Sequence, residues 1–151
     1  MKIPFVDLKA QYKTIEKEIH QAINEVLVNT SFIKGKHVES FERNYANIIG
    51  VKHCIGVGNG TDALIISLKT LGIGPGDEVI VPANSFIATS EAVTAVGAKN
   101  VFVDCDPKTY NICIDEIEAK ITTQTKAIIA VHLYGQMADM ESIMNIASKF
   151  C

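Results

Sequence analysis

The order of hydrophobic and polar residues predicts two amphipathic helices at the start of the chain. Between residues 11 and 28 the apolar side chains recur every three or four positions, which gives a helix one apolar face. Residues 38–48 repeat this spacing, and Gly50 is a typical helix end. We expect residues 1–10, which contain Pro4, to form an extended arm before the first helix.

From residue 54 onward, short apolar runs alternate with helical patterns. The runs expected to form strands are residues 54–57, 78–82, 101–103 and 127–133, the last of them buried on both faces. The expected helices are one from a glycine-rich corner to Gly72, one capped by Asn84 or Ser85 and ending at Gly97, a short one capped by Asp115, and a last one over residues 138–150. This alternation predicts an α/β fold, with a mostly parallel sheet and helices on both faces.

Composition supports a folded domain and narrows its expected partners. The chain has 151 residues, of which 48% are hydrophobic, enough to build a core. Its formal net charge of −3 comes from charges of both signs spread along the chain, so neither nucleic acid nor a membrane is an expected partner. Pro4 and Asp7 interrupt the apolar run that a signal peptide would need, and we therefore expect a cytoplasmic protein.

The cysteines do not form a recognisable metal or disulfide pattern. Cys54, Cys105, Cys113 and Cys151 show no Cys-x-x-Cys spacing. We expect them to be reduced, with no metal site and no disulfide.

The glycine-rich corner, Gly58-Asn59-Gly60-Thr61-Asp62, has the chemistry of an anion site. The first N–H groups of a helix point outward together at the positive end of the helix dipole, where a phosphate can bind. A dinucleotide fingerprint would need a third glycine where this chain has Thr61, and the Gly-Lys-Ser/Thr of a P-loop is absent from the sequence. A strand-to-helix turn without a ligand is equally compatible with the motif taken alone.

Two further stretches are expected beside this corner, because the carboxyl ends of parallel strands share one edge of the sheet. Phe86 follows the second expected strand, where its ring could lie against a ligand ring or belong to the core. His132 ends the run 127–133, where it could contact a ligand or bond to nearby backbone.

Taken together, these motifs resemble the DegT/StrS-type nucleotide-sugar aminotransferases, which use pyridoxal phosphate (PLP). The resemblance rests on residues 4–12, 38–42, 60–64, 71–80, 97–104 and 131–135, in the family's order and across essentially the whole chain. It implies the first part of the large domain of the aspartate-aminotransferase fold (fold type I), truncated, with an N-terminal arm and helices over residues 1–50 and the start of the PLP-binding domain over residues 51–151. It also implies a homodimer whose subunits share the sites.

The resemblance assigns roles to particular residues. Gly60, Thr61 and Asp62 are similar to the family's phosphate-binding corner, with the Asp62 carboxylate turned away from the anion, and Phe86 is similar to the aromatic residue that stacks on the pyridine ring. The family's Schiff-base lysine and its pyridine-facing aspartate fall beyond Cys151. No lysine here matches a catalytic position, so we expect residues 1–151 to lack the essential base.

Several functions remain open at this point. The resemblance favours transfer of an amino group, from glutamate, to a keto-sugar nucleotide, and the opening residues 4–12 are similar to members that aminate carbon 3 of a dTDP-linked sugar. A PLP-dependent sugar dehydratase of the same family and a non-catalytic fragment or binding module are the alternatives. An NAD-binding domain is disfavoured by Thr61. An isolated chain of this kind is expected to be marginally stable or to aggregate, because its sheet would have an exposed edge.

Overall fold

The computed structural model describes residues 3–150, which divide into two compact units. The first unit ends at Gly56 and the second begins at Val57. The expected domain boundary between residues 50 and 51 stays a prediction.

The first unit holds two helices, α1 (Leu8–Val28) and α2 (Lys36–Ile49), and both confirm the apolar periodicity. Helix α1 begins three residues before the predicted start because Asp7 caps it, its carboxylate accepting the N–H of Ala10 at 2.9 Å. Helix α2 ends as predicted at Gly50, which adopts the left-handed conformation with φ of 72°.

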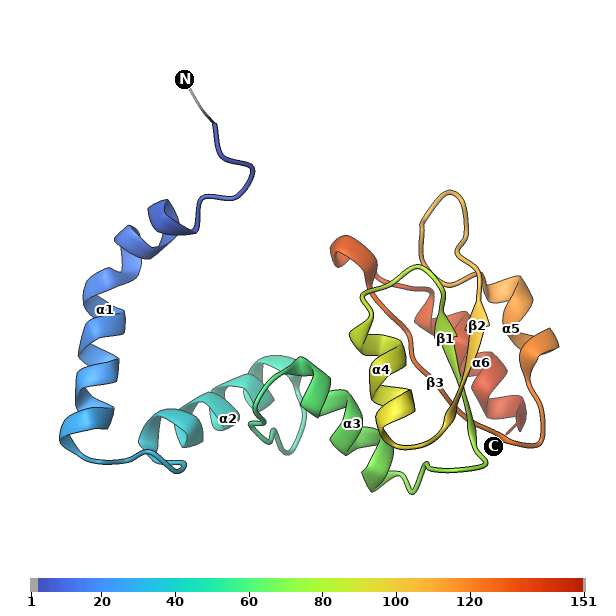
Figure 1. Ribbon diagram of the computed structural model, residues 1–151, viewed down its shortest axis with the longest axis horizontal. Helices are drawn as coiled ribbons and strands as arrows, with labels where there is room; N and C mark the ends of the chain where they lie inside the picture. The colour runs from blue at the N-terminus through green and yellow to red at the C-terminus, as the bar shows by residue number, and fades with distance from the viewer. Residues whose placement is uncertain (1–2, 151) are drawn as a thin grey trace. The chain divides into compact units, whose positions relative to one another are not determined.

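The second unit is a parallel three-stranded sheet in the order β2-β1-β3, with helices on both faces (Figure 1). Its strands are β1 (Glu78–Pro82), β2 (Lys99–Val103) and β3 (Thr125–Ile128). Its helices are α3 (Gly60–Thr70), α4 (Ala88–Ala95), α5 (Ile114–Lys120) and α6 (Met140–Phe150). The predicted α/β architecture is therefore confirmed.

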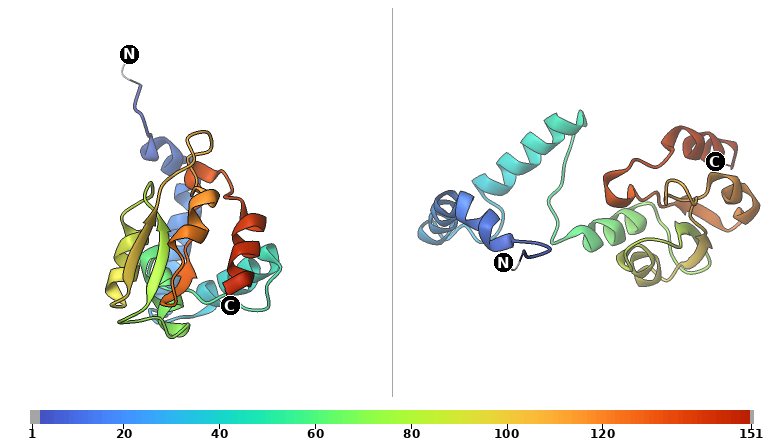
Figure 2. Two further views of the ribbon diagram at one scale, coloured as in Figure 1. Left: turned by 90° about the vertical axis from the view of Figure 1, so that its right-hand side faces the viewer. Right: turned by 90° about the horizontal axis from the view of Figure 1, so that it is seen from above.

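Successive side chains of the central strand β1 point to opposite faces of the sheet, and each face has its own hydrophobic core. Val79 and Val81 pack with residues of α3 and α4, whereas Ile80 packs with residues of α5 and α6. All three side chains are fully buried. Figure 2 shows the same layering from two other directions, with α4 on one side of the sheet and α5 and α6 on the other.

The strand predicted at residues 54–57 is wrong. In the described residues this segment is irregular backbone, and Ile55 is 77% exposed. The N–H of Gly56 donates to the Glu42 carboxylate at 2.8 Å and so has a partner without a neighbouring strand.

The strand predicted at residues 127–133 is shorter than expected and is not buried on both faces. Strand β3 ends at Ile128 and its side chains are half-buried or exposed, because it is the outer strand and pairs with β1 alone. The last ladder bond runs from the Ile129 N–H to the Ile80 carbonyl at 2.9 Å. His132 therefore lies in a loop, not at a strand end.

Two predicted helix caps are also wrong. Helix α4 follows Ile87 without a side-chain cap, and the Ser85 hydroxyl bonds instead to the carbonyls of Pro82 and Phe86. Helix α5 follows Cys113, which places Asp115 inside the first turn. There its negative charge still interacts favourably with the positive end of the helix dipole. Helix α6 begins at Met140 because Asp139 caps it through the N–H of Ser142.

None of the helices within residues 3–150 combines the length and the apolar character that crossing a bilayer requires.

Candidate functional site

The loops that follow the three strands meet at one end of the sheet, as the parallel topology predicts (Figure 1). The loop after β1 carries Phe86, the loop after β2 carries Asn111, and the loop after β3 carries His132. Helix α3 leads into the amino end of β1 through residues 71–77, so the last turn of α3 is the one nearest that end. We take the carboxyl end of the sheet, together with the first turn of α3, as the candidate site.

The glycine-rich corner is closed by a reciprocal pair of side chains. The Asn59 side-chain oxygen accepts the N–H of Asp62 at 2.9 Å, and the Asn59 amide donates to the Asp62 carboxylate at 3.0 Å. This arrangement is similar to a capping box, except that the Asp62 carboxylate bonds to the Asn59 side chain and not to its backbone N–H, and it fixes the first turn of α3. The Ala63 N–H is also used, donating to the Asn59 carbonyl at 3.1 Å.

The cap leaves two backbone donors for a ligand. Within residues 3–150 the N–H groups of Gly60 and Thr61 have no hydrogen-bond partner, and neither has the Thr61 hydroxyl. A Cβ placed on Gly60 would meet nothing within 4 Å, so the space beside this residue is open. Two free N–H groups at the positive end of a helix dipole fit a phosphate.

The acidic side chain of Asp62 is turned back over the chain that precedes the helix. A Cβ on Gly58 would lie 2.6 Å from the Asp62 Oδ2 atom, so this carboxylate occupies the space that a side chain at position 58 would need. A glycine at position 58 is therefore required for the Asn59–Asp62 pair to form.

Phe86 is not a core residue. Its side chain is 78% exposed in the turn between β1 and α4. Among the described residues its ring stacks on no other aromatic ring. An exposed, unpartnered ring is available to a planar ligand.

His132 bonds to backbone of its own loop through one ring nitrogen. Its Nδ1 accepts the N–H of Ala138 at 3.1 Å, so in the neutral imidazole the proton lies on Nε2. The loop then forms a short 3₁₀ turn, η1 (Leu133–Gly135), in which Tyr134 has a φ of 53°. The prediction that His132 could bond to nearby backbone is thus confirmed. The other ring nitrogen, Nε2, still has a proton to donate.

Two asparagines of the site were not singled out from the sequence. Asn59 could have been found from its spacing to Asp62, because Asn-x-x-Asp before an apolar helix is a capping signal. Asn111 carries no such local signal, since its partners lie more than 20 positions away.

No metal site appears in the part of the chain that the structure describes, where no three His, Cys, Asp or Glu side chains are grouped to hold an ion. Cys54, Cys105 and Cys113 form no disulfide. Cys151 lies outside the described residues.

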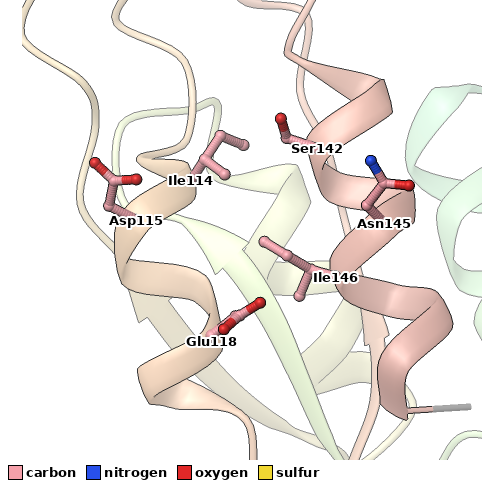
Figure 3. Close-up of a pocket in the computed structure, with 6 residues that line it drawn as sticks. All are labelled: Ile114, Asp115, Glu118, Ser142, Asn145 and Ile146. Atoms are coloured by element: carbon pink, nitrogen blue, oxygen red, sulfur yellow. The ribbon is translucent and has the colours of Figure 1, made fainter.

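A separate hollow of about 400 Å³ lies between α5 and α6, away from the predicted residues (Figure 3). Ile114 and Ile146 point into it from the two helices, whereas Asp115 points away. It is open to solvent and brings none of the candidate residues together.

These features define a class of protein: an α/β domain with a parallel sheet and a glycine-rich turn at the start of a helix. Residues 13–150 match the model of the DegT/DnrJ/EryC1/StrS aminotransferase family. The chain belongs to this family.

Named relatives agree with the family match. The chain is 52% identical to the dTDP-3-amino-3,6-dideoxy-alpha-D-galactopyranose transaminase of Aneurinibacillus thermoaerophilus, with 98% of this chain and 41% of that protein covered. It is 49% identical to the UDP-2-acetamido-2-deoxy-3-oxo-D-glucuronate aminotransferase of Pseudomonas aeruginosa, again over 98% of this chain and 41% of that protein.

The solved structure of NtdA from Bacillus subtilis with bound cofactor PMP superposes with a TM-score of 0.94 at 41% identity, over 99% of this chain and 34% of that one. The chain thus spans about 40% of the length of the curated relatives it matches.

Proposed function

We propose that the protein carrying this chain is a PLP-dependent aminotransferase that moves an amino group, from glutamate, to a keto-sugar nucleotide. The observation that carries the proposal is the first turn of α3, where the N–H groups of Gly60 and Thr61 have no partner within residues 3–150 and the space beside Gly60 is open. Relatives that are sugar aminotransferases and a PMP-bound structural relative support it.

In this proposal the chain's own residues bind and orient the cofactor. Gly60 and Thr61 donate backbone hydrogen bonds to its phosphate, and the Thr61 hydroxyl adds a third donor. The Asp62 carboxylate stays on Asn59, away from the anion. Phe86 covers one face of the cofactor ring. When bound, PLP supplies the electron sink that amino transfer requires.

We place the covalent lysine and the carboxylate facing the pyridine nitrogen outside residues 1–151. Lys69 lies late in α3, and Lys126 is the second residue of the outer strand β3. Neither lysine lies in the loops at the carboxyl end of the sheet. Lys108 does lie in the loop after β2.

The cofactor roles are tested by PLP binding to the protein expressed from its full gene. Replacing Phe86 with Ala should weaken PLP binding by about 2- to 10-fold, the range expected for loss of a stacked ring. Phe102→Ala is the matched control, because Phe102 is another exposed phenylalanine, on β2, outside the proposed site. Equal affinities in the two variants would contradict the role of Phe86.

Borohydride reduction followed by peptide mapping locates the covalent lysine. The proposal expects the pyridoxyl group on a peptide outside residues 1–151. A modified lysine within this chain, Lys108 included, would contradict that placement.

Isotope-labelled glutamate separates amino transfer from the alternatives. An aminotransferase carries the labelled nitrogen into the sugar product, whereas a sugar dehydratase of this family releases a deoxygenated sugar without it. A non-catalytic binding module gives neither product from dTDP- or UDP-linked keto-sugars.

We also propose a cytoplasmic homodimer. The support for a second subunit is the apolar surface on α2, where Phe41, Tyr45 and Ile48 are 55%, 47% and 78% exposed. Light scattering on the protein from its full gene tests this, and a monomer at micromolar concentration would contradict it.

A further inference from the structure

Asn111 is a buried polar residue that joins two loops at the carboxyl end of the sheet. It lies in the loop between β2 and α5, and only 5% of it is exposed. Its amide nitrogen donates to the carbonyls of Gln136 and Met137 at 3.3 and 3.1 Å. Its amide oxygen accepts the N–H of Leu133 at 3.2 Å. Every one of these partners is backbone of the loop that follows β3.

The two loops that Asn111 joins both contain strained backbone. Tyr110 and Tyr134 have φ of 60° and 53°, in the left-handed region that bulky residues rarely adopt. Such conformations persist where the surrounding structure holds them, and they concentrate at ligand sites. Tyr134 is 96% exposed, so burial of its side chain in the core does not explain the strained backbone.

The loop after β3 is held from a second direction by its own histidine. The bond from the Ala138 N–H to the His132 ring closes the loop at its end, while Asn111 holds its middle. The backbone around Tyr134 is thus held by the hydrogen bonds of both Asn111 and His132. The Tyr134 side chain is exposed to solvent at the end of the sheet where the candidate site lies.

We propose that Asn111 is a positioning residue, which holds the loop of residues 132–137 and the Tyr134 side chain in place against the ligand bound at the carboxyl end of the sheet. This inference rests on the proposed function, since it is the keto-sugar or the cofactor that Tyr134 would contact. Asn111 itself touches backbone and acts through the loop.

The test compares two isosteric substitutions in the protein expressed from its full gene. Asn111→Asp keeps the shape but places a carboxylate oxygen against the carbonyls of Gln136 and Met137. Asn100→Asp is the matched control, because the Asn100 amide also donates twice, to the Ser90 carbonyl and the Thr94 hydroxyl, beside α4. Amide hydrogen exchange, PLP affinity, and kcat and KM for the keto-sugar are measured in both.

We expect Asn111→Asp to speed exchange about tenfold or more in residues 132–138 while exchange in β1 stays as in the parent protein. KM for the keto-sugar or the dissociation constant of PLP should rise about tenfold with a smaller change in kcat. Asn100→Asp should leave both the loop and the affinities unchanged, even where it lowers the melting temperature.

Exchange that is unchanged in the loop, or a loop that loosens without any loss of affinity, would overturn the proposal. If Asn111→Asp fails to fold, His132→Ala loosens the same loop by removing the acceptor of the Ala138 N–H, and the same confined exchange and loss of affinity are expected. A parent protein that binds no PLP contradicts the proposed function instead, and the exchange data then decide separately whether Asn111 holds the loop.

Discussion

Gly97 shows how a single position combines backbone and packing requirements. Its φ is 80°, and a Cβ there would lie 3.0 Å from the Cγ atom of Pro75. Its N–H donates to the Thr94 carbonyl and so ends the helix that precedes β2. A helix end at this glycine was predicted from the sequence, but the crowding that a side chain here would meet from Pro75 is visible only in the folded chain.

Gly97→Ala should lower the free energy of unfolding by about 1–2 kcal/mol, because alanine is strained in the left-handed region and its methyl group crowds Pro75. Gly74→Ala is the control, since Gly74 has no positive φ and its added Cβ would meet the Val96 carbonyl at an ordinary 3.7 Å. Urea unfolding measures both. Equal losses in the two variants would contradict the strain argument.

At the scale of elements, capping decides where the helices begin, and the nearest polar residue does not always provide the cap. Asp7, Asn59 and Asp139 cap α1, α3 and α6, whereas Ser85 and Asp115 were expected to cap helices and do not. A cap depends on the direction in which the chain enters the helix, and tertiary contacts set that direction.

Asn59→Ala should destabilise the second unit by about 1 kcal/mol, because the Asp62 N–H loses its acceptor and the Asp62 carboxylate loses its donor. Asn59→Ser should recover most of this loss, since serine also accepts a bond from the third residue of the helix. Thermal unfolding of the two variants gives the comparison. A serine variant as unstable as the alanine variant would show that capping is not the cause.

A buried carboxylate joins three elements at the amino end of the sheet. Glu78, 4% exposed on β1, accepts from the Lys99 ammonium at 2.7 Å and from the Thr122 hydroxyl at 2.6 Å. These bonds favour the charged form, and they hold the pKa of Glu78 below its ordinary value, with Lys99 as the largest cause. Burial acts in the opposite direction and is the smaller effect.

The pKa of Glu78 predicts how stability depends on pH. Because the folded-state pKa is lowered, the contribution of Glu78 is fully present above the ordinary glutamate pKa and is lost as the pH falls through the lowered value. The parent protein should therefore exceed Glu78→Gln in melting temperature at neutral pH, and the difference should shrink on acidification. Glu116→Gln, at an exposed position on α5, is the control. A difference that does not change with pH would contradict the role of the charge.

At the scale of the whole described chain, the sheet has an outer strand with an apolar groove beside it. Strand β3 is last in the order β2-β1-β3, and a groove of about 610 Å³ runs along it, lined mainly by apolar residues such as Ile128, Met144 and Phe150. Lys126 is an exposed charge on this strand. A lysine on an edge strand discourages pairing with a strand of another molecule.

Lys126→Ile should increase self-association of the chain of residues 1–151, raising its mean molar mass by light scattering about twofold or more at equal concentration. Lys120→Ile, at the end of α5, removes the same charge away from the edge and should have a smaller effect. Equal association of the two variants would show that net charge, not the edge, controls it.

The local pattern of hydrophobic and polar residues was sufficient to predict those helices that depend mainly on neighbouring residues. The periodicity of α1 and α2 and the helix ends at Gly50 and Gly97 were predicted because a helix forms from contacts three and four residues apart. The alternation of strands and helices likewise predicted the parallel sheet, because short connections leave few other arrangements.

Tertiary structure alone decided which apolar runs become strands and which polar groups meet. Residues 54–57 remain irregular and β3 stops at Ile128, because a strand extends only as far as a neighbour pairs with it. Asn111 reaches the loop after β3 across more than 20 positions of sequence, and Glu78 reaches Thr122 across 44. Sequence by itself determined the family, the fold class and the glycine corner, whereas the attachment of the loop after β2 to the loop after β3 depends on long-range hydrogen bonds that no local pattern encodes.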